Sequence, residues 1–324
     1  MRIAILGAGL TGAYLYRRLA GQGRRVEVFG KDPGTRCGIS PCAWGTSCGF
    51  AELVKEAGLD ASAYTLSYSD YVCIDEIRLK ADLITIDKQK LIQDLLQGAR
   101  ISREQPDVRF YDRVIDATGV SRALLPQTGD DLILSCIQFR VSTDETLDNR
   151  AELGGIGYAW CFPLSGGEYH IGCGSFVSDP LERLKALGWI GGNGSRRKII
   201  CGCKGDIRLA SPHACLPFVV GEKEHQVWGV GEAIGCVAPL AGDGIVPGLK
   251  SARMLLERWD DPDGYTAAVL KEFGWMKKER AVVDKLRRGE KLGLDSAWVV
   301  KRNSKRMGIE VGLKEASAIL RRLI

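Results

Sequence analysis

The chain lacks several features from which function is often inferred. No stretch of its 324 residues is apolar over the roughly 18 residues that a membrane-spanning helix needs, so no transmembrane helix is expected. The first residues predict a strand and a glycine turn, whereas a signal peptide begins with a charged and then an apolar segment. No internal repeat and no low-complexity linker is visible. These absences lead us to expect a cytoplasmic protein.

Histidine is scarce, and this weakens a whole class of enzyme mechanisms. The chain has three histidines, His170, His213 and His225, and none stands beside an evident acidic partner in the sequence. A Gly-x-Ser-x-Gly elbow is absent as well. The sequence therefore does not favour a histidine-based acid–base or hydrolase mechanism.

Metal-ligand spacing is also missing, although the chain has eleven cysteines. Structural zinc sites usually use paired C-x2-C motifs, and none is present. Cys37, Cys42 and Cys48 are spaced too widely for a plant-type iron–sulfur loop. We expect no metal, and mostly free thiols in a reducing cytosol.

What is present begins with a nucleotide-binding pattern at the N-terminus. The apolar run 1–6 is followed by Gly7-Ala8-Gly9-Leu10-Thr11-Gly12, a helix-like segment and a second strand at 26–29. Gly7 allows a tight turn, Gly9 lets the backbone approach a pyrophosphate, and Gly12 lets the helix pack on the strand. The N–H groups and positive dipole at the helix N-terminus favour phosphate. This context predicts a bound dinucleotide.

The acid that usually ends the second strand and binds the ribose is missing. Gly30 stands there, followed by Lys31 and Asp32. Either Asp32 replaces that acid in FAD binding, or Lys31 with Arg24 and Arg25 favours the 2′-phosphate of NADP.

A second glycine-rich segment favours FAD. A small-residue strand and turn at 227–235 continues through Pro239 and Gly242-Asp243-Gly244 into an amphipathic helix at 245–259. Flavoproteins use such a second helix entrance for the ribityl–pyrophosphate and the isoalloxazine edge. Between the two glycine-rich segments, an apolar strand ends in Asp116-Ala117-Thr118-Gly119, which recurs where a chain re-enters a flavin domain.

An aromatic stretch supplies the candidate substrate surface. Tyr158, Trp160 and Phe162 alternate along a predicted strand and so share one face, and Pro163 ends the strand. A second strand follows the turn at 165–167 and ends in Gly172 and Gly174. The pattern fits either the core hairpin of a sheet or a pocket for a flat or apolar ligand.

Taken together, these segments resemble the geranylgeranyl reductase family, flavoproteins that saturate prenyl double bonds, including those of archaeal membrane lipids. The resemblance covers about residues 1–260 and includes the glycine-rich segments, the aromatic-Pro stretch, and Cys37-Gly38 with Pro41-Cys42. The chain departs from the family at Gly30, at Glu232 where Asp is usual, and at Lys88 where a helix-start Arg is expected. The segment between Ala99 and Val114 is also short.

The resemblance implies FAD as cofactor. The residues that it assigns to FAD binding are Gly7, Gly9, Leu10, Thr11, Gly12, Lys31, Asp32, Cys37, Gly38, Lys88, Ala117, Thr118, Gly119, Gly231, Glu232, Gly242, Asp243, Gly244 and Ile245. The sequence contains one complete nucleotide-binding turn, so electrons are expected from an external carrier, either ferredoxin or transiently bound NAD(P)H.

The implied reaction is hydride transfer from reduced FAD to a C=C bond of a geranylgeranyl-type lipid, with a proton added to the other carbon. Tyr158, Trp160, Phe162 and Pro163 would contact the substrate, and the rings of Tyr158 and Trp160 would stabilise developing positive charge. The loop from Cys37 to Cys42 would lie over the flavin. Cys37 is the first candidate proton donor, with Cys42 and the Tyr158 hydroxyl as alternatives. A Cys37–Cys42 disulfide, or a purely structural role for either thiol, stays open.

The expected fold is α/β, with a doubly wound, Rossmann-like FAD-binding domain, an inserted and mainly antiparallel β-sheet substrate domain, and a helical C-terminus. The three parts are assigned, in that order, to residues 1–51, 85–126 and 225–262, to residues 52–84 and 127–224, and to residues 263–324.

The C-terminal part concentrates the basic charge. From Asp284 onward eleven Lys or Arg stand against five Asp or Glu, while the whole chain has a net charge of +5. This segment is either a surface that touches anionic lipid or a solvated helical face. Trp298-Val299-Val300 is predicted to be the packed side of a helix. Neither a nucleic-acid-binding fold motif nor interleaved basic and aromatic residues is found.

Three other functions fit parts of the sequence. The first is a flavin monooxygenase of the aromatic-hydroxylase type. The second is a non-catalytic flavin- or lipid-binding relative, suggested by Gly30. The third is a flavin-free NADP-dependent reductase, suggested by Gly30 and Lys31, although the second glycine-rich segment disfavours it.

Overall fold

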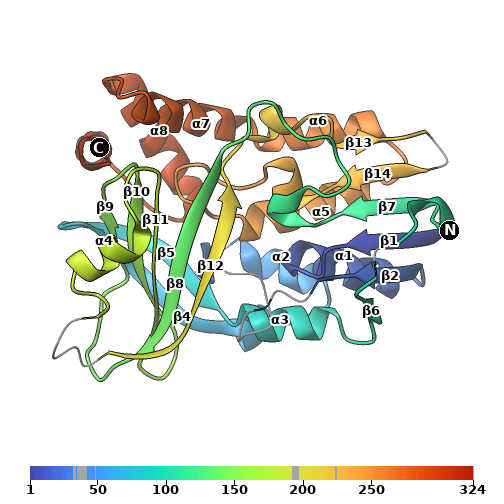
Figure 1. The fold of residues 1–324 in the computed structure, drawn as a ribbon, viewed down its shortest axis with the longest axis horizontal. Helices are drawn as coiled ribbons and strands as arrows, with labels where there is room; N and C mark the ends of the chain where they lie inside the picture. The colour runs from blue at the N-terminus through green and yellow to red at the C-terminus, as the bar shows by residue number, and fades with distance from the viewer. Residues whose placement is uncertain are drawn as a thin grey trace.

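The computed structural model describes residues 1–31, 34, 42–47, 49–104, 106–191, 197–222 and 225–323. Two sheets lie side by side, with the N-terminus at the six-stranded sheet and the C-terminus beyond the eight-stranded sheet (Figure 1). The predicted α/β class with a helical C-terminus is confirmed. No helix in the described part of the chain is long and apolar enough to cross a membrane.

The six-stranded sheet forms the nucleotide-binding half. Its order is β13 (Val219–Val220), β14 (Gln226–Gly229), β7 (Arg113–Asp116), β1 (Arg2–Leu6), β2 (Arg25–Phe29) and β6 (Ile101–Ser102). All neighbours pair in parallel except β13 with β14. The central strand β1 is buried from Ile3 to Leu6, as expected for a parallel strand covered on both faces.

Helices cover this sheet. The helices that pack on it include α1 (Leu10–Gly21), α2 (Phe50–Glu56), α3 (Lys88–Leu95) and α5 (Ile245–Glu257). Their apolar sides share one core with the strands, including Ile5, Tyr14, Phe50 and Leu249. This packing places the N-termini of α1 and α5 near each other, beyond the carboxyl end of the central strand β1, as the two glycine-rich segments predict.

The eight-stranded sheet is mainly antiparallel. Its order is β12 (Lys198–Arg208), β8 (Ile133–Ser142), β11 (Glu168–Ser175), β10 (Gly157–Pro163), β9 (Arg150–Leu153), β4 (Thr65–Ile74), β5 (Ile77–Ile86) and β3 (Gly45–Ser47). The pair β4–β9 is parallel. Helix α4 (Pro180–Ala186) packs against β8, β10 and β11 through Leu184.

Four helices follow α5 in the described chain: the first packs in the core of the nucleotide-binding half, and the other three pack against β4 and β5. They are α6 (Pro262–Glu272), α7 (Gly274–Arg287), α8 (Leu294–Ser304) and α9 (Leu313–Arg322). Val72 and Leu79 of the sheet pack with Leu286 of α7, Ala297 of α8 and Ile319 of α9.

The assigned boundaries differ from the structure at short elements. Residues 45–47 form β3, which pairs with β5 in the eight-stranded sheet, although they fall within the range assigned to the FAD-binding part. Helix α2 packs in the nucleotide-binding core, and β13 joins the six-stranded sheet, although both extend into ranges assigned to the substrate part. The prediction that Trp298 packs inside was wrong, because its side chain is 54% exposed.

Candidate functional site

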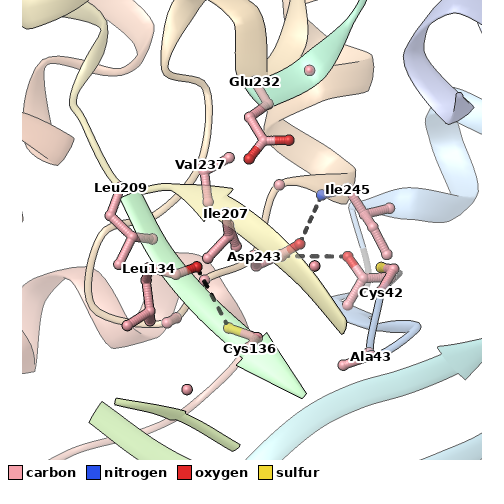
Figure 2. Close-up of a pocket in the computed structure, with 18 of the residues that line it drawn as sticks. Cys42, Ala43, Leu134, Cys136, Ile207, Leu209, Glu232, Val237, Asp243 and Ile245 are labelled. Carbon is pink, nitrogen blue, oxygen red and sulfur yellow. Dashed lines mark hydrogen bonds between the residues drawn. The ribbon is translucent and has the colours of Figure 1, made fainter. Parts of the chain in front are cut away.

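A cavity of about 810 Å³ lies between the two sheets and continues beneath the C-terminal helices. The glycine turn 7–11 and the segment 239–245 line one part of it, and β10 crosses its middle. Ile74, Leu286, Val300 and Ile319 line the part beneath the helices. Figure 2 shows the middle of the cavity, where Cys42, Cys136 and Asp243 approach from separate segments.

The first glycine turn is closely packed at Gly7 and Gly12 and open at Gly9. A Cβ on Gly7, whose φ is +109°, would lie 2.1 Å from the Ala117 carbonyl oxygen, and one on Gly12 would lie 1.9 Å from the Gly7 oxygen. A Cβ on Gly9 would meet no atom within 4 Å, so the backbone there is open to the cavity. Gly7 and Gly12 thus have no room for a side chain, as the turn and the packing of helix on strand require, and Gly9 leaves open space.

The second glycine-rich segment lies directly against the first. A Cβ on Gly231 would lie 3.0 Å from the Thr11 hydroxyl oxygen, and one on Gly248 would lie 2.7 Å from it. The Gly231 N–H donates to Ser251 Oγ at 2.8 Å, which fixes the turn on α5. Thr11 therefore joins the two helix entrances, and both face one cavity.

Asp243 lies in this cavity, two residues before the start of α5. Its Oδ1 accepts the Ile245 N–H at 2.9 Å, and Thr46 on β3 donates to Oδ2 at 3.4 Å (Figure 2). Burial raises the pKa of Asp243 to about 6, an effect that these bonds and the charge of Lys88 partly offset. The site therefore holds a buried carboxyl whose pKa lies above the ordinary value of an aspartate.

Glu232 is the second buried acid of the site. Its Oε1 accepts the Arg208 N–H at 2.7 Å, and burial raises its pKa. Lys88, at the start of α3, lies near enough to favour the charged forms of both Glu232 and Asp243. Ala117, Thr118 and Gly119 line the cavity beside Glu232.

The aromatic row lies on one face of β10, as predicted. The ring centroids of Tyr158 and Trp160 are 5.8 Å apart, those of Trp160 and Phe162 are 6.5 Å apart, and all three line the cavity. Tyr158 pairs across the sheet with Gly174, and Trp160 pairs with Gly172. A Cβ on Gly172 would lie 2.2 Å from Trp160 Cζ2, so the glycine gives the indole room to lie against β11.

Two side chains bond the backbone at Cys42 and Ala43, which follow the cysteine loop, and hold it beside this row. Gln138 on β8 accepts the Trp160 Nε1–H at 3.2 Å and donates to the Cys42 carbonyl at 2.9 Å. His170 on β11 bonds the Ala43 carbonyl through Nδ1 at 3.1 Å. Burial lowers the pKa of His170 to about 4, so its ring is neutral at pH 7 and donates this bond.

Of the three candidate proton donors, Cys42 and Tyr158 lie among the described residues. Cys42 is a free cysteine at the cavity wall. The Tyr158 hydroxyl donates to the Ala241 carbonyl, and burial raises its pKa, which makes it a weaker acid. Asp32, Cys37, Gly38 and Cys48 lie outside the described residues. Pro163 ends β10, and Lys31 lines the cavity near Gly30.

Sequence reasoning missed several residues of the site. Gln138 and Thr46 act through contacts between distant segments, which no local pattern reveals. Glu104 lines the cavity beyond the two-residue strand β6, near Gly30 and Lys31. A Cβ on Gly30 would lie 2.9 Å from Ala8 Cβ, so a side chain at that position would crowd the glycine turn.

In the described part of the chain, no group of three or more His, Cys, Asp or Glu side chains is arranged to hold a metal ion.

No family model matches the chain. An uncharacterized protein of Methanocaldococcus jannaschii is 26% identical over 88% of this chain and 90% of its own length. A menaquinone reductase of Mycobacterium tuberculosis is 35% identical, over 33% of this chain and 27% of its own length.

Solved structures establish the fold. A geranylgeranyl bacteriochlorophyll reductase-like protein of Thermoplasma acidophilum has a TM-score of 0.71 and 17% identity, covering 100% of this chain and 95% of its own. A p-nitrophenol 4-monooxygenase of Pseudomonas putida has a TM-score of 0.64 and 12% identity, covering 98% and 96%. The predicted fold is confirmed, because the chain shares it over nearly its whole length with both of these solved proteins.

Proposed function

We propose that this chain is an FAD-dependent oxidoreductase that reduces C=C bonds of a prenyl lipid. One observation carries the proposal: a dinucleotide cradle, an aromatic row and an apolar lobe line a single cavity. The solved reductase-like neighbour and the partial match to a menaquinone reductase support the substrate class.

FAD fits the residues present. The open backbone at Gly9 and the N-termini of α1 and α5 would hold the phosphates, and Gly231 with Glu232 would hold the ribityl chain. Glu104 offers a carboxylate near the position where the usual ribose acid is missing. Lys88 compensates the charge of the buried acids. Reduced FAD, when bound, supplies hydride.

The chain's own residues provide the rest of the chemistry. The part of the cavity beneath the C-terminal helices, which the apolar side chains named above line, would exclude water and hold the lipid. The faces of Tyr158 and Trp160 would stabilise positive charge developing on the alkene. Gln138 and His170 hold the backbone at Cys42 and Ala43, and so position the end of the cysteine loop. We assign proton delivery to this loop, with Cys37 first and Cys42 second, because Tyr158 is engaged with Ala241. Electrons would come from ferredoxin or transiently bound NAD(P)H.

The test begins with a visible spectrum of the purified protein, before and after dithionite under anaerobic conditions. We expect oxidised-flavin bands that bleach and FAD that is released on denaturation. A protein that stays colourless after FAD is added would refute the flavoenzyme. The reduced protein should then convert a geranylgeranyl lipid to products with two more hydrogens per reduced bond, as detected by mass spectrometry.

Variants then separate the proton donors. Tyr158→Phe keeps the ring and loses only the hydroxyl, so it should retain turnover. Cys37→Ala and Cys42→Ala, compared under the same conditions, should show which thiol is required. Loss of turnover in Tyr158→Phe with normal FAD content would move the proton donor to Tyr158.

A flavin monooxygenase is the second candidate, since the p-nitrophenol 4-monooxygenase covers nearly the whole chain at a TM-score of 0.64. It predicts NADPH oxidation coupled to oxygen consumption with an aromatic substrate. The reductase predicts lipid reduction without oxygen, so anaerobic turnover distinguishes the two.

A further inference from the structure

Helix α8 has two chemically different sides. At about 3.6 residues per turn, one side of the helix and its continuation into Lys305 presents Leu294, Trp298, Lys301, Arg302 and Lys305. The opposite side is part of the interior: Ala297 is buried in the core with α7 and α9, and Val300 and Ser304 line the cavity. The helix is thus a wall between the cavity and the outside.

The outward side exposes large apolar groups that proteins usually bury. Leu294 is 68% exposed and Trp298 is 54% exposed. The Lys301 ammonium lies 4.8 Å from the Trp298 ring centroid, so a cation and an aromatic ring share one surface. Figure 1 places α8 at the outer end of the molecule, far from β1 and β2.

The charge of this side is strongly positive. Within the described residues, Lys301, Arg302 and Lys305 form no ion pair with a carboxylate. The exposed carboxylate of Asp295 on the same helix is bonded by Lys285 at 2.7 Å. An anionic surface would therefore find three uncompensated cations beside an exposed Trp and Leu.

We propose that this outward side of α8 docks on an anionic lipid bilayer. Tryptophan and leucine favour the membrane interface, and Lys and Arg close to an anionic leaflet are attracted to its charge. Docking there would set the helix that lines the cavity against the membrane, on the path of a lipid substrate. That consequence rests on the proposed function, whereas the docking itself does not.

Co-sedimentation with vesicles tests the proposal without any turnover. The whole protein, as purified, is mixed with vesicles of phosphatidylcholine and phosphatidylglycerol, or of phosphatidylcholine alone. We expect binding to the anionic vesicles that weakens as salt is added. Lys301→Gln/Lys305→Gln should lower the partition constant roughly fivefold per charge, or about 25-fold. Trp298→Ser should also reduce it.

Matched variants elsewhere control for charge and apolarity. Lys198→Gln/Lys204→Gln removes the same charge from exposed positions of β12, and Phe110→Ser removes another exposed aromatic ring, 61% exposed, just before β7. Both should bind as the unaltered protein does. Failure of the unaltered protein to bind anionic vesicles, or equal losses in the control variants, would overturn the proposal. Neither result would bear on the FAD spectrum.

Discussion

Gln138 shows how one side chain fixes two parts of the candidate site. Its amide accepts the Trp160 indole N–H and donates to the Cys42 carbonyl, so the aromatic row and the cysteine loop are held together. We expect Gln138→Leu to leave the buried Trp160 N–H unpaired and to lower the free energy of unfolding by about 1–3 kcal/mol. Urea unfolding measures this loss.

The chain offers a matched control in its other sheet. Trp228 donates its indole N–H to Gln226 at 3.2 Å, the same distance as the Trp160–Gln138 bond. Gln226→Leu should destabilise the protein to a similar degree but leave the flavin spectrum and lipid turnover per bound FAD unchanged. If both variants lose turnover equally, Gln138 has no positioning role.

Glu279 on α7 is a carboxyl that the proposed mechanism leaves unused. It lines the cavity and accepts the N–H of Leu240 at 3.2 Å; Leu240 lies in the loop that leads to Asp243. Burial raises its pKa from 4.5 to about 7. Because the unfolded chain releases this proton at lower pH, the free energy of unfolding falls by about 3 kcal/mol as pH rises from about 4.5 to 7.

Glu279→Gln should remove this pH dependence while keeping an acceptor for Leu240. We expect the variant to gain stability relative to the unaltered protein as pH rises, with the gain complete above about pH 7. Urea unfolding across this pH range measures it. Glu182→Gln, which removes an exposed carboxylate on α4, is the control for the loss of one negative charge. Parallel curves for Glu279→Gln and the unaltered protein would contradict a raised pKa.

Strand β11 is built around the space that its glycines leave for neighbouring side chains. A Cβ on Gly172 would lie 2.2 Å from the Trp160 ring and 2.8 Å from the Ile137 carbonyl oxygen. A Cβ on Gly174 would lie 2.7 Å from Cys136 Sγ and 3.0 Å from Leu134 Cδ2, both of which are side-chain atoms that can move.

Gly172→Ala should therefore cost about 1–3 kcal/mol of stability and shift the indole, while Gly174→Ala should cost less. Urea unfolding and near-ultraviolet circular dichroism measure both effects. Gly129→Ala, where a Cβ would meet no atom within 4 Å, serves as the control. A larger loss in Gly174→Ala than in Gly172→Ala would refute this account of the aromatic row.

The elements that could be predicted from the sequence are those with a long pattern or a glycine at a required place. The buried run of β1, the turn before α1 and the alternating rings of β10 are of this kind. Strands β3, β6 and β13 have two or three residues, too few to show a period, so only their pairing partners define them. Trp298 was misplaced because an aromatic residue in a helical pattern usually packs inside. The contacts of Gln138 and Glu279 join segments that no local pattern connects.

At the scale of the whole molecule, the cavity joins parts that are far apart in sequence. The turn at 7–12, the strand end at 116–119 and the segment 231–245 meet at the six-stranded sheet, and β8 and β10 close the cavity from the other sheet. A ligand that fills this space contacts both halves. Binding of FAD should therefore stabilise the molecule as a unit.

We expect added FAD to raise the free energy of unfolding of FAD-depleted protein by about 2.7 kcal/mol at 100 times its dissociation constant. Urea unfolding followed by circular dichroism measures the shift. Gly9→Val is the informative variant, because a Cβ there would meet no protein atom within 4 Å, and the side chain would occupy the space proposed for the pyrophosphate. It should fold, yet show no shift and no bound flavin. Gly21→Val, also without atoms within 4 Å but outside the cavity, should respond as the unaltered protein does. An undiminished shift in Gly9→Val would mean that FAD binds elsewhere.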